Sequence, residues 1–327
     1  MNVAGIDIGA FKHAISTPRK DFILDARYIE KLIDTLAEED ITTVVLEPTG
    51  IYHIPIIKTL LDHGFQVYMV HSTRFGRFRA GFGKKKGDAE DAQLLRKVAE
   101  MGSEYLYPID EDWVEAKFLG WILLEHSRTT KNYTMEINRL RRDLYLVDPS
   151  LAFMTPSSYK EENFEGLDFG DMTFYILSRV KEIDRLRELK KNLEKEIKRR
   201  VTNHEDGKIL LSIPGISYLT AGLLISAYVN INRYRNLRHF KSMLGYGLNT
   251  KLSGESVNVV RASKAHIPIR AALFRVVLSQ ANKPNKIGEY YREYRRRMPF
   301  RKAVLRTSAK IIEWIYYMLK KRLMWED

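Results

Sequence analysis

The sequence of 327 residues contains no cysteine. Disulfide bonds, thiolate nucleophiles and zinc sites built on thiolates are therefore excluded. No apolar run reaches the roughly 18 residues that a membrane-spanning helix needs, and the first residues, MNVAGIDIGAF, lack the basic and apolar regions of a signal peptide. Internal repeats and low-complexity tracts are also absent. These absences predict a soluble protein of the cytoplasm.

Acidic residues are outnumbered, with 41 Asp and Glu against 54 Lys and Arg, which gives a formal net charge of +13. An excess of this size favours nucleic acid, or another anionic surface, as the partner. Hydrophobic residues make up 45% of the chain, enough to build a sizeable core. The length allows two domains or one large one.

The first hundred residues alternate between strand and helix patterns. Short β-branched or apolar runs predict strands over 2–8, 11–17, 21–24, 41–48 and 66–71. Helical spacing of apolar residues predicts helices over 26–39 and 52–63. This order predicts an α/β domain over residues 1–108, with later strands that are parallel because helices connect them.

From residue 112 onward the pattern becomes helical. Residues 171–202 carry apolar side chains at alternating steps of three and four, typical of a coiled coil: Ile176, Val180, Ile183, Leu186, Leu189, Leu193 and Ile197. The segment 149–170 predicts a linker or a hairpin turn. We therefore expect a helical assembly region over 109–203 and an all-α domain over 204–327. In the latter, S-I-P-G-I resembles a helix-hairpin-helix turn that can grip phosphate.

Four acidic residues stand where the predicted elements would bring them together. Asp7 interrupts the apolar strand pattern G-I-D-I-G, where an unpaired charge is costly. Glu47 closes the strand V-V-L-E, at the edge where α/β folds build their sites. Asp88 and Asp91 lie three residues apart at the start of a predicted helix and share one face. Such oxygen ligands suit one or two Mg²⁺ or Mn²⁺ ions, which can activate a nucleophile and stabilise a phosphoryl transition state.

A purely structural interpretation of these acids stays open. Asp88 can cap its helix with Asp91 at the third helical position, as in a capping box. Asp7 can flank a turn, and Glu47 can end a strand at the surface. Glu90 lies off the shared face and is expected to be solvated. The order of elements nevertheless resembles the RNase H-like core of RuvC-type nucleases, which favours the metal site.

A basic stretch, STRFGRFRAGFGKKKG, precedes the two aspartates. It holds six basic residues and no acidic one, with phenylalanines interleaved: Arg74, Arg77, Arg79, Lys84, Lys85 and Lys86. Cations neutralise phosphates and aromatic rings stack on bases, so we expect a flexible loop that orders on single-stranded nucleic acid or RNA. The alternative is a solvated loop whose phenylalanines pack into the core. The tail 292–322, with eleven basic residues against two Glu, predicts further DNA or RNA binding.

The motifs together resemble one family over residues 3 to about 280. They are GIDIG, LEPTGIY, KKKGDAEDA, SIPGI, and FKSMLGYGLNTKLSGES followed by RASK. This combination is similar to the insertion-sequence transposases of the "one-ten" type, which are bridge-RNA-guided serine recombinases, and to the related pilin-gene DNA invertases.

The resemblance implies a RuvC-like N-terminal domain with Asp7, Glu47, Asp88 and Asp91 as its metal-binding DEDD set. It also implies that Ser253 is a nucleophile that attacks a DNA phosphodiester and forms a covalent phosphoserine link. Three cations that flank this serine in the sequence are candidates to stabilise the developing charge: Lys251, Arg261 and Lys264. Ser256 and Ser263 remain rival nucleophiles, because loop serines are common and no nearby base singles one out.

The family further implies a structured guide RNA that pairs with donor and target DNA. It implies dimers that form a tetramer in the synaptic complex, with two protomers completing each composite site, and a nucleoid-associated location on DNA. Three other functions stay open from the residues alone. These are a guide-independent DNA invertase, a Holliday-junction-like hydrolytic nuclease and a non-catalytic nucleic-acid-binding protein.

Overall fold

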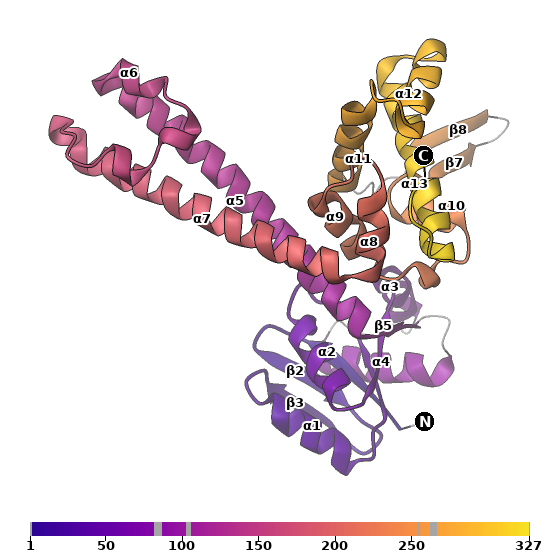
Figure 1. The fold of residues 1–327 in the computed structure, drawn as a ribbon. Helices are drawn as coiled ribbons and strands as arrows, with labels where there is room; N and C mark the ends of the chain where they lie inside the picture. Colours follow the sequence, from indigo (N-terminus) through magenta and orange to yellow (C-terminus); the bar gives the residue numbers. More distant parts are fainter. Residues whose placement is uncertain (1, 82–86, 103–105, 254–255, 262–266, 327) are drawn as a thin grey trace. The chain divides into compact units, whose positions relative to one another are not determined.

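The computed structural model describes residues 2–81, 87–102, 106–253, 256–261 and 267–326 (Figure 1). The chain forms two compact units, residues 1–117 and 118–327. The sequence predicted three domains, with boundaries at 108/109 and 203/204. The division into two compact units does not test these boundaries, which stay predictions. Within the described residues, no helix is both long and apolar enough to cross a membrane.

A six-stranded mixed sheet forms the centre of the first unit (Figure 1). In spatial order its strands are β3 (Asp21–Asp25), β2 (Lys12–Ser16), β1 (Val3–Ile8), β4 (Thr43–Leu46), β5 (Gln66–Val70) and β6 (Leu106–Ile109). β4 pairs in parallel with β1 and with β5, whereas the other pairs are antiparallel. The predicted mixed α/β unit is confirmed. The sequence did not predict β6, a four-residue edge strand that contains Pro108.

Four helices cover this sheet: α1 (Ile29–Glu38), α2 (His53–Asp62), α3 (Ser72–Gly81) and α4 (Asp88–Met101). Val3 and Val45 point to one face, where they form a buried cluster with Phe75 of α3 and Leu95 of α4. Side chains alternate along a strand, so Ile6 lies on the opposite face, and it is fully buried there. The sheet is thus covered on both faces, as strands joined by helical crossovers require.

Residues 72–81 form helix α3, and the predicted flexible loop is wrong for this part of the basic stretch. The physical reason is burial of aromatic surface. Phe75 is 1% exposed, and Phe78 packs partly buried against the same cluster. The alternative in which the phenylalanines pack into the core therefore applies to these two. Lys84, Lys85 and Lys86 lie outside the described residues.

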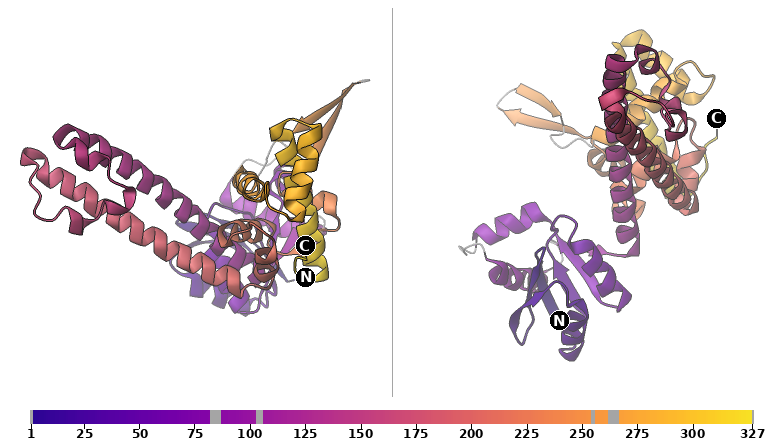
Figure 2. Two further views of the ribbon diagram at one scale, coloured as in Figure 1. Left: turned by 45° about the horizontal axis from the view of Figure 1, so that its top comes forward. Right: turned by 90° about the vertical axis from the view of Figure 1, so that its left-hand side faces the viewer.

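Two long helices, α5 (Glu111–Val147) and α7 (Thr173–Asn203), run side by side from residue 118 onward (Figures 1 and 2). Ile176, Val180 and Ile183 of the predicted seam are buried in the hairpin core. Leu189 is 39% exposed, so the apolar seam is interrupted there. Between the two helices lie α6 (Pro149–Ala152) and three short 3-10 helices, η2 (Pro156–Ser158), η3 (Glu161–Asn163) and η4 (Gly170–Met172).

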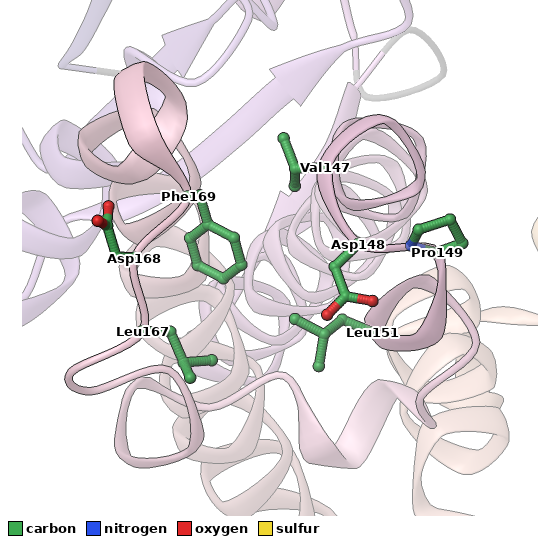
Figure 3. Close-up of a pocket in the computed structure, with 7 residues that line it drawn as sticks. All are labelled: Val147, Asp148, Pro149, Leu151, Leu167, Asp168 and Phe169. Carbon is green, nitrogen blue, oxygen red and sulfur yellow. The ribbon is translucent and has the colours of Figure 1, made fainter.

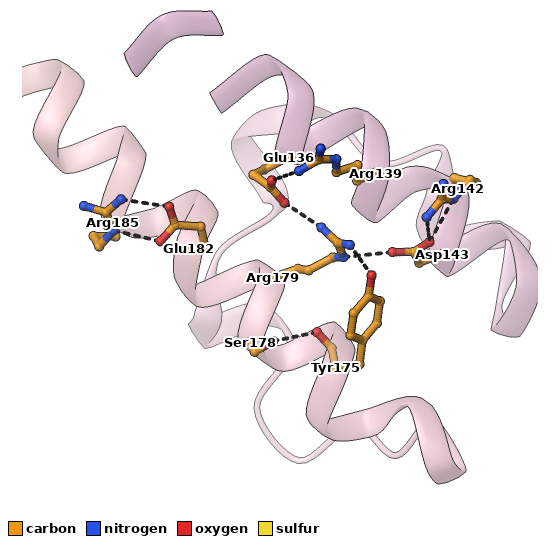
Figure 4. A network of polar contacts seen from close by, with 9 residues as sticks. All are labelled: Glu136, Arg139, Arg142, Asp143, Tyr175, Ser178, Arg179, Glu182 and Arg185. Atoms are coloured by element: carbon orange, nitrogen blue, oxygen red, sulfur yellow. Dashed lines mark hydrogen bonds and ion pairs between the residues drawn. The ribbon is translucent and has the colours of Figure 1, made fainter. Parts of the chain in front are cut away.

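Arg179 joins the two helices through polar contacts (Figure 4). Its guanidinium donates to Glu136 at 2.6 Å and forms an ion pair with Asp143 at 2.9 Å. It also donates to the hydroxyl of Tyr175, whose ring it covers. The Asp143 side chain is 5% exposed, so this charge needs its partners.

A hollow lies near the end of the hairpin (Figure 3). It is lined by Val147, Asp148, Pro149, Leu151, Leu167, Asp168 and Phe169. Asp148 accepts hydrogen bonds from the backbone and hydroxyl of Ser150. Asp168 accepts from the hydroxyl of Thr173. Asp148 is the N-cap residue of α6. Asp168 holds the start of α7 through Thr173.

The remaining chain is helical around one large core: α8 (Glu205–Ser212), α9 (Tyr218–Tyr228), η5 (Ile231–Arg233), α10 (Leu237–Met243), α11 (Ile267–Gln280), α12 (Lys286–Arg297) and α13 (Phe300–Lys321). The expectation of an all-α region needs one correction. β7 (Leu248–Ser253) and β8 (Ser256–Arg261) pair antiparallel. Alternating β-branched residues in S-V-N-V-V, next to a two-residue connection, favour such a hairpin.

The segment S-I-P-G-I, predicted as a helix-hairpin-helix turn, connects α8 to α9. Gly215 has a φ of +82°, a left-handed conformation that glycine adopts without strain. The hydroxyl of Ser217 accepts a hydrogen bond from the backbone N–H of Thr220 at 3.3 Å and so caps α9. Phosphate binding at this turn stays a prediction.

The close approach of α4 to β1 at Gly5 yields a first prediction. A Cβ at this position would lie 2.1 Å from the carbonyl oxygen of Ala92 and 2.5 Å from the backbone nitrogen of Arg96. Backbone atoms of a packed helix yield little, so Gly5→Ala is expected to destabilise the first unit by about 1–3 kcal/mol. Hydrogen exchange at the amides of α4 should accelerate accordingly.

Gly76→Ala is the matched control. A Cβ at Gly76 in α3 meets nothing within 4 Å, and alanine favours helix over glycine by about 1 kcal/mol. This variant should be as stable as the wild type or more so. Unchanged exchange at α4 in the Gly5→Ala protein would contradict the close approach.

Candidate active site

The pairing of β1 with β4 places the first two predicted carboxylates next to each other. The parallel register runs from Val3 opposite Thr43 to Ile6 opposite Leu46. Asp7 and Glu47 come one residue later on each strand. Because side chains in register share a face of a sheet, both carboxylates project on the face of Val3 and Val45. That is the face covered by α3 and α4.

Helix α4 brings the other two carboxylates to this face. It packs against β1 along the backbone of Gly5, two residues before Asp7 on the same side of the strand. Asp88 is the first residue of α4 and is exposed, whereas Asp91, one turn later, is 5% exposed. The four predicted acids thus come from two adjacent strand ends and one helix start.

The start of α4 differs from the predicted capping box. The N-cap residue is Gly87, in an extended conformation, and Asp88 is the first helical residue. Glycine is among the residues that tolerate this position. Glu90 is exposed as expected, and its side chain folds back over Gly87. The caps therefore do not account for Asp88 and Asp91, although acids at a helix N-terminus also gain from the helix dipole.

A cation already lies among the carboxylates. The guanidinium of Arg79 donates to Oε2 of Glu47 at 3.0 Å, and its Nε lies 2.8 Å from Oδ1 of Asp91. The sequence predicted Arg79 only as a nucleic-acid contact and missed this role. The spacing puts Arg79 one helical turn after the apolar Phe75, on the same face of a helix, but it does not indicate the partners of Arg79, which lie on other elements.

The electrostatics of Asp7 reflect this crowding. Burial, followed by the charges of Asp88, Asp91 and Glu47, raises the pKa of the Asp7 carboxyl from 3.8 to about 6, whereas the charge of Arg79 lowers it. Like charges disfavour ionisation of a neighbouring acid. The cluster thus carries more negative charge than its own cation neutralises.

The donor set fits a hard divalent cation in its chemistry. All four groups are carboxylates, the oxygen ligands that Mg²⁺ and Mn²⁺ prefer, and the charges of Asp88, Asp91 and Glu47 all act on Asp7. Among the described residues, however, no three such side chains converge closely enough to hold an ion. Instead of a metal ion, the guanidinium of Arg79 contacts the carboxylates of Glu47 and Asp91.

The predicted residues of the second unit are only partly described. Ser253 ends β7, where its backbone pairs with Ser256 of β8. Lys251 lies in β7 and Arg261 in β8, with side chains outside the described part. Lys264 and Ser263 lie wholly outside it, and Arg74 and Arg77 are placed in α3 by backbone alone. Their roles stay predictions.

The pKa of Asp7 yields a prediction for the protein held metal-free with a chelator. An acid whose pKa is higher in the folded state costs stability as pH rises from about 4 through 6. Asp7→Asn removes this cost, so its melting temperature should exceed that of the wild type at pH 7 by more than at pH 4. Because the group is only about half-buried, solvent screening limits the gain to about 1 kcal/mol, or roughly 2–4 °C.

Asp34→Asn controls for the loss of one carboxylate, since Asp34 is exposed on α1. Its melting temperature relative to the wild type should change little between pH 4 and pH 7. Thermal scans at both pH values measure the effect. An Asp7→Asn difference that does not grow with pH would show that the pKa of Asp7 is not raised in the folded protein.

Two models of known protein families match this chain, and together they include residues of both units. Residues 4–149, which contain all four carboxylates, match a DEDD transposase model of the IS110 type, described as a transposase. Residues 207–292, which contain β7 and β8, match the model of the transposase IS116/IS110/IS902 family. No curated protein matches the chain. The two matches together identify the protein as a member of the IS110-type family of insertion-sequence transposases, enzymes that recombine DNA.

Proposed function

We propose that this transposase is an RNA-guided, site-specific DNA recombinase that exchanges strands through a covalent phosphoserine intermediate. The observation that carries the proposal is the gathering of four carboxylates on one face of the sheet, in a chain whose other family match includes Ser253. A RuvC-like fold of the first unit is part of the proposal. The strand order β3-β2-β1-β4-β5, with β1 and β4 parallel, supports it.

Asp7, Glu47, Asp88 and Asp91 are the residues that would hold a divalent metal, which DEDD transposases typically use. Mg²⁺ or Mn²⁺ would supply charge stabilisation to a phosphoryl transition state and would favour ionisation of a nucleophile. Asp7 and Glu47 are set by strand register, and Asp88 and Asp91 by the packing of α4 on Gly5. Such rigid placement suits a site that must orient oxygen ligands.

Ser253 is the proposed nucleophile. Its hydroxyl oxygen forms a bond to the phosphorus of a DNA phosphodiester as the bond to a deoxyribose oxygen breaks, and the hydroxyl proton passes to a base or to the leaving oxygen. The phosphoester energy is retained in the protein–DNA link, so rejoining needs no nucleotide cofactor. Lys251, Arg261 and Lys264 are proposed to stabilise the charge on phosphorus-bound oxygens.

The proposed partners are donor and target DNA, a structured guide RNA and further copies of the chain, as a dimer and a synaptic tetramer. The net charge of +13 supports polyanion binding. The basic residues proposed as contacts in the first unit are Arg74, Arg77, Arg79, Lys84, Lys85 and Lys86. On DNA, the protein would be nucleoid-associated.

Covalent capture of DNA tests the nucleophile. Wild-type protein incubated with cognate DNA and Mg²⁺ should form an adduct visible on a denaturing gel, and Ser253→Ala should reduce it by more than about a thousandfold, because the attacking atom is gone. Ser256→Ala and Ser263→Ala are matched controls. An adduct that persists in Ser253→Ala but disappears in either control would assign the nucleophile to the rival serine.

Asp88→Asn separates recombination from simple hydrolysis. It should abolish both adduct formation and DNA cleavage, since a carboxylate of the metal site is lost. A hydrolytic nuclease, which the carboxylates alone would also suit, would cleave DNA with Ser253→Ala as efficiently as the wild type. Cleavage of that kind would overturn the phosphoserine mechanism.

RNA that co-purifies with the full chain tests guide dependence. Sequencing should recover one discrete, structured RNA encoded beside the protein's own gene, because basic surface alone would retain RNA without preference. Recombination should fall to background after ribonuclease treatment and return when that RNA is added back. Full activity without RNA would instead favour the guide-independent invertase.

A further inference from the structure

We propose that Arg79 is a built-in competitor of the divalent metal, a cation that occupies the carboxylate cluster until metal binding displaces it. The inference rests on the proposed metal site and deepens it. Arg79 lies on α3, outside the DEDD set, yet its guanidinium contacts two of the four DEDD carboxylates. Metal loading would therefore require a change in the contacts of α3.

The contacts of Arg79 use oxygen atoms that a metal would need. Oε2 of Glu47 accepts a hydrogen bond from Nη2, and Oδ1 of Asp91 lies 2.8 Å from Nε. That Nε is buried and makes no aligned hydrogen bond to any described residue, so the contact with Asp91 is chiefly electrostatic. A guanidinium and a dication repel each other at such distances. The two cations thus exclude one another.

The position of Arg79 is enforced by packing. Phe75, one turn earlier on α3, is buried between the sheet and α4. The guanidinium carbon of Arg79 lies 4.9 Å from the centre of the Phe75 ring, within the range of a cation–π contact. The Arg79 side chain is 21% exposed, and those of Glu47 and Asp91 are 23% and 8% exposed. Partial burial strengthens ion pairs that bulk water would screen.

The charge count explains why an exchange is favourable. Four ionised carboxylates outnumber the single guanidinium whose contacts with Glu47 and Asp91 neutralise part of their charge. A divalent ion neutralises more of that charge than the single charge of Arg79 does. The arginine therefore stabilises the metal-free protein and lowers its apparent metal affinity, two effects of one coupling.

Metal binding, measured without any DNA or activity, tests the proposal. Mn²⁺ alone is titrated into the full chain and followed by electron paramagnetic resonance of the free ion. Arg79→Gln should bind Mn²⁺ more tightly than the wild type, by on the order of tenfold. It should melt at a lower temperature in chelator and gain more from added Mn²⁺.

Arg27→Gln is the matched control, because Arg27 also pairs with an acid, Asp25, but on the exposed β3 side of the same unit. Its Mn²⁺ affinity should equal that of the wild type. Arg79→Lys keeps the positive charge and should bind Mn²⁺ with an affinity between those of the wild type and Arg79→Gln. It also serves as the test variant if Arg79→Gln does not fold.

If Arg79 had only a structural role, its substitution would not increase the affinity for Mn²⁺. If it only held α3 and the carboxylates in place, Arg79→Gln or Arg79→Lys would bind Mn²⁺ as the wild type does or more weakly, and either result would overturn the competition. Failure of the metal site itself looks different. In that case neither wild type nor Arg79→Gln would bind Mn²⁺ more tightly than Asp88→Asn does.

Discussion

Crowded negative charge on one face of a sheet is the constraint around which the first unit is arranged. Asp7 and Glu47 are neighbours because β1 and β4 pair in parallel register, and α4 adds Asp88 and Asp91. Like charges repel one another, and burial together with the neighbouring carboxylates raises the pKa of Asp7 to about 6. The fold thereby retains electrostatic strain that a bound divalent cation would relieve.

Packing on the same face makes that arrangement possible. Gly5 lets the backbone of α4 approach β1 more closely than any other residue would permit, and Phe75 anchors α3 beside it. The same two helices that bury this face also supply two aspartates and one arginine. Hydrophobic burial and the geometry of the charged cluster therefore cannot vary independently.

The second unit is organised by different forces. Its helices share one large apolar core, within which Tyr228 donates to Asp206 at 2.7 Å and Arg322 pairs with the same carboxylate. These contacts connect α8 and α9 to the end of α13. The hairpin β7–β8 leaves this core as a separate two-stranded element, a form that has marginal stability on its own. A nucleophile there would depend on partners to hold it in position.

The sequence by itself determined the α/β order and the long helices, because apolar periodicity is a local property of the chain. The role of Asp7, Glu47, Asp88 and Asp91 as a metal site stays a prediction. The sequence did not determine that residues 72–81 would be helical, since burial of Phe75 against the sheet outweighed the glycines. Nor did we predict the edge strand β6, which depends on its pairing with the distant strand β5, or the hairpin β7–β8, which the local sequence favours. The place of Arg79 between Glu47 and Asp91 was decided by tertiary structure alone, because it depends on three elements meeting on one face.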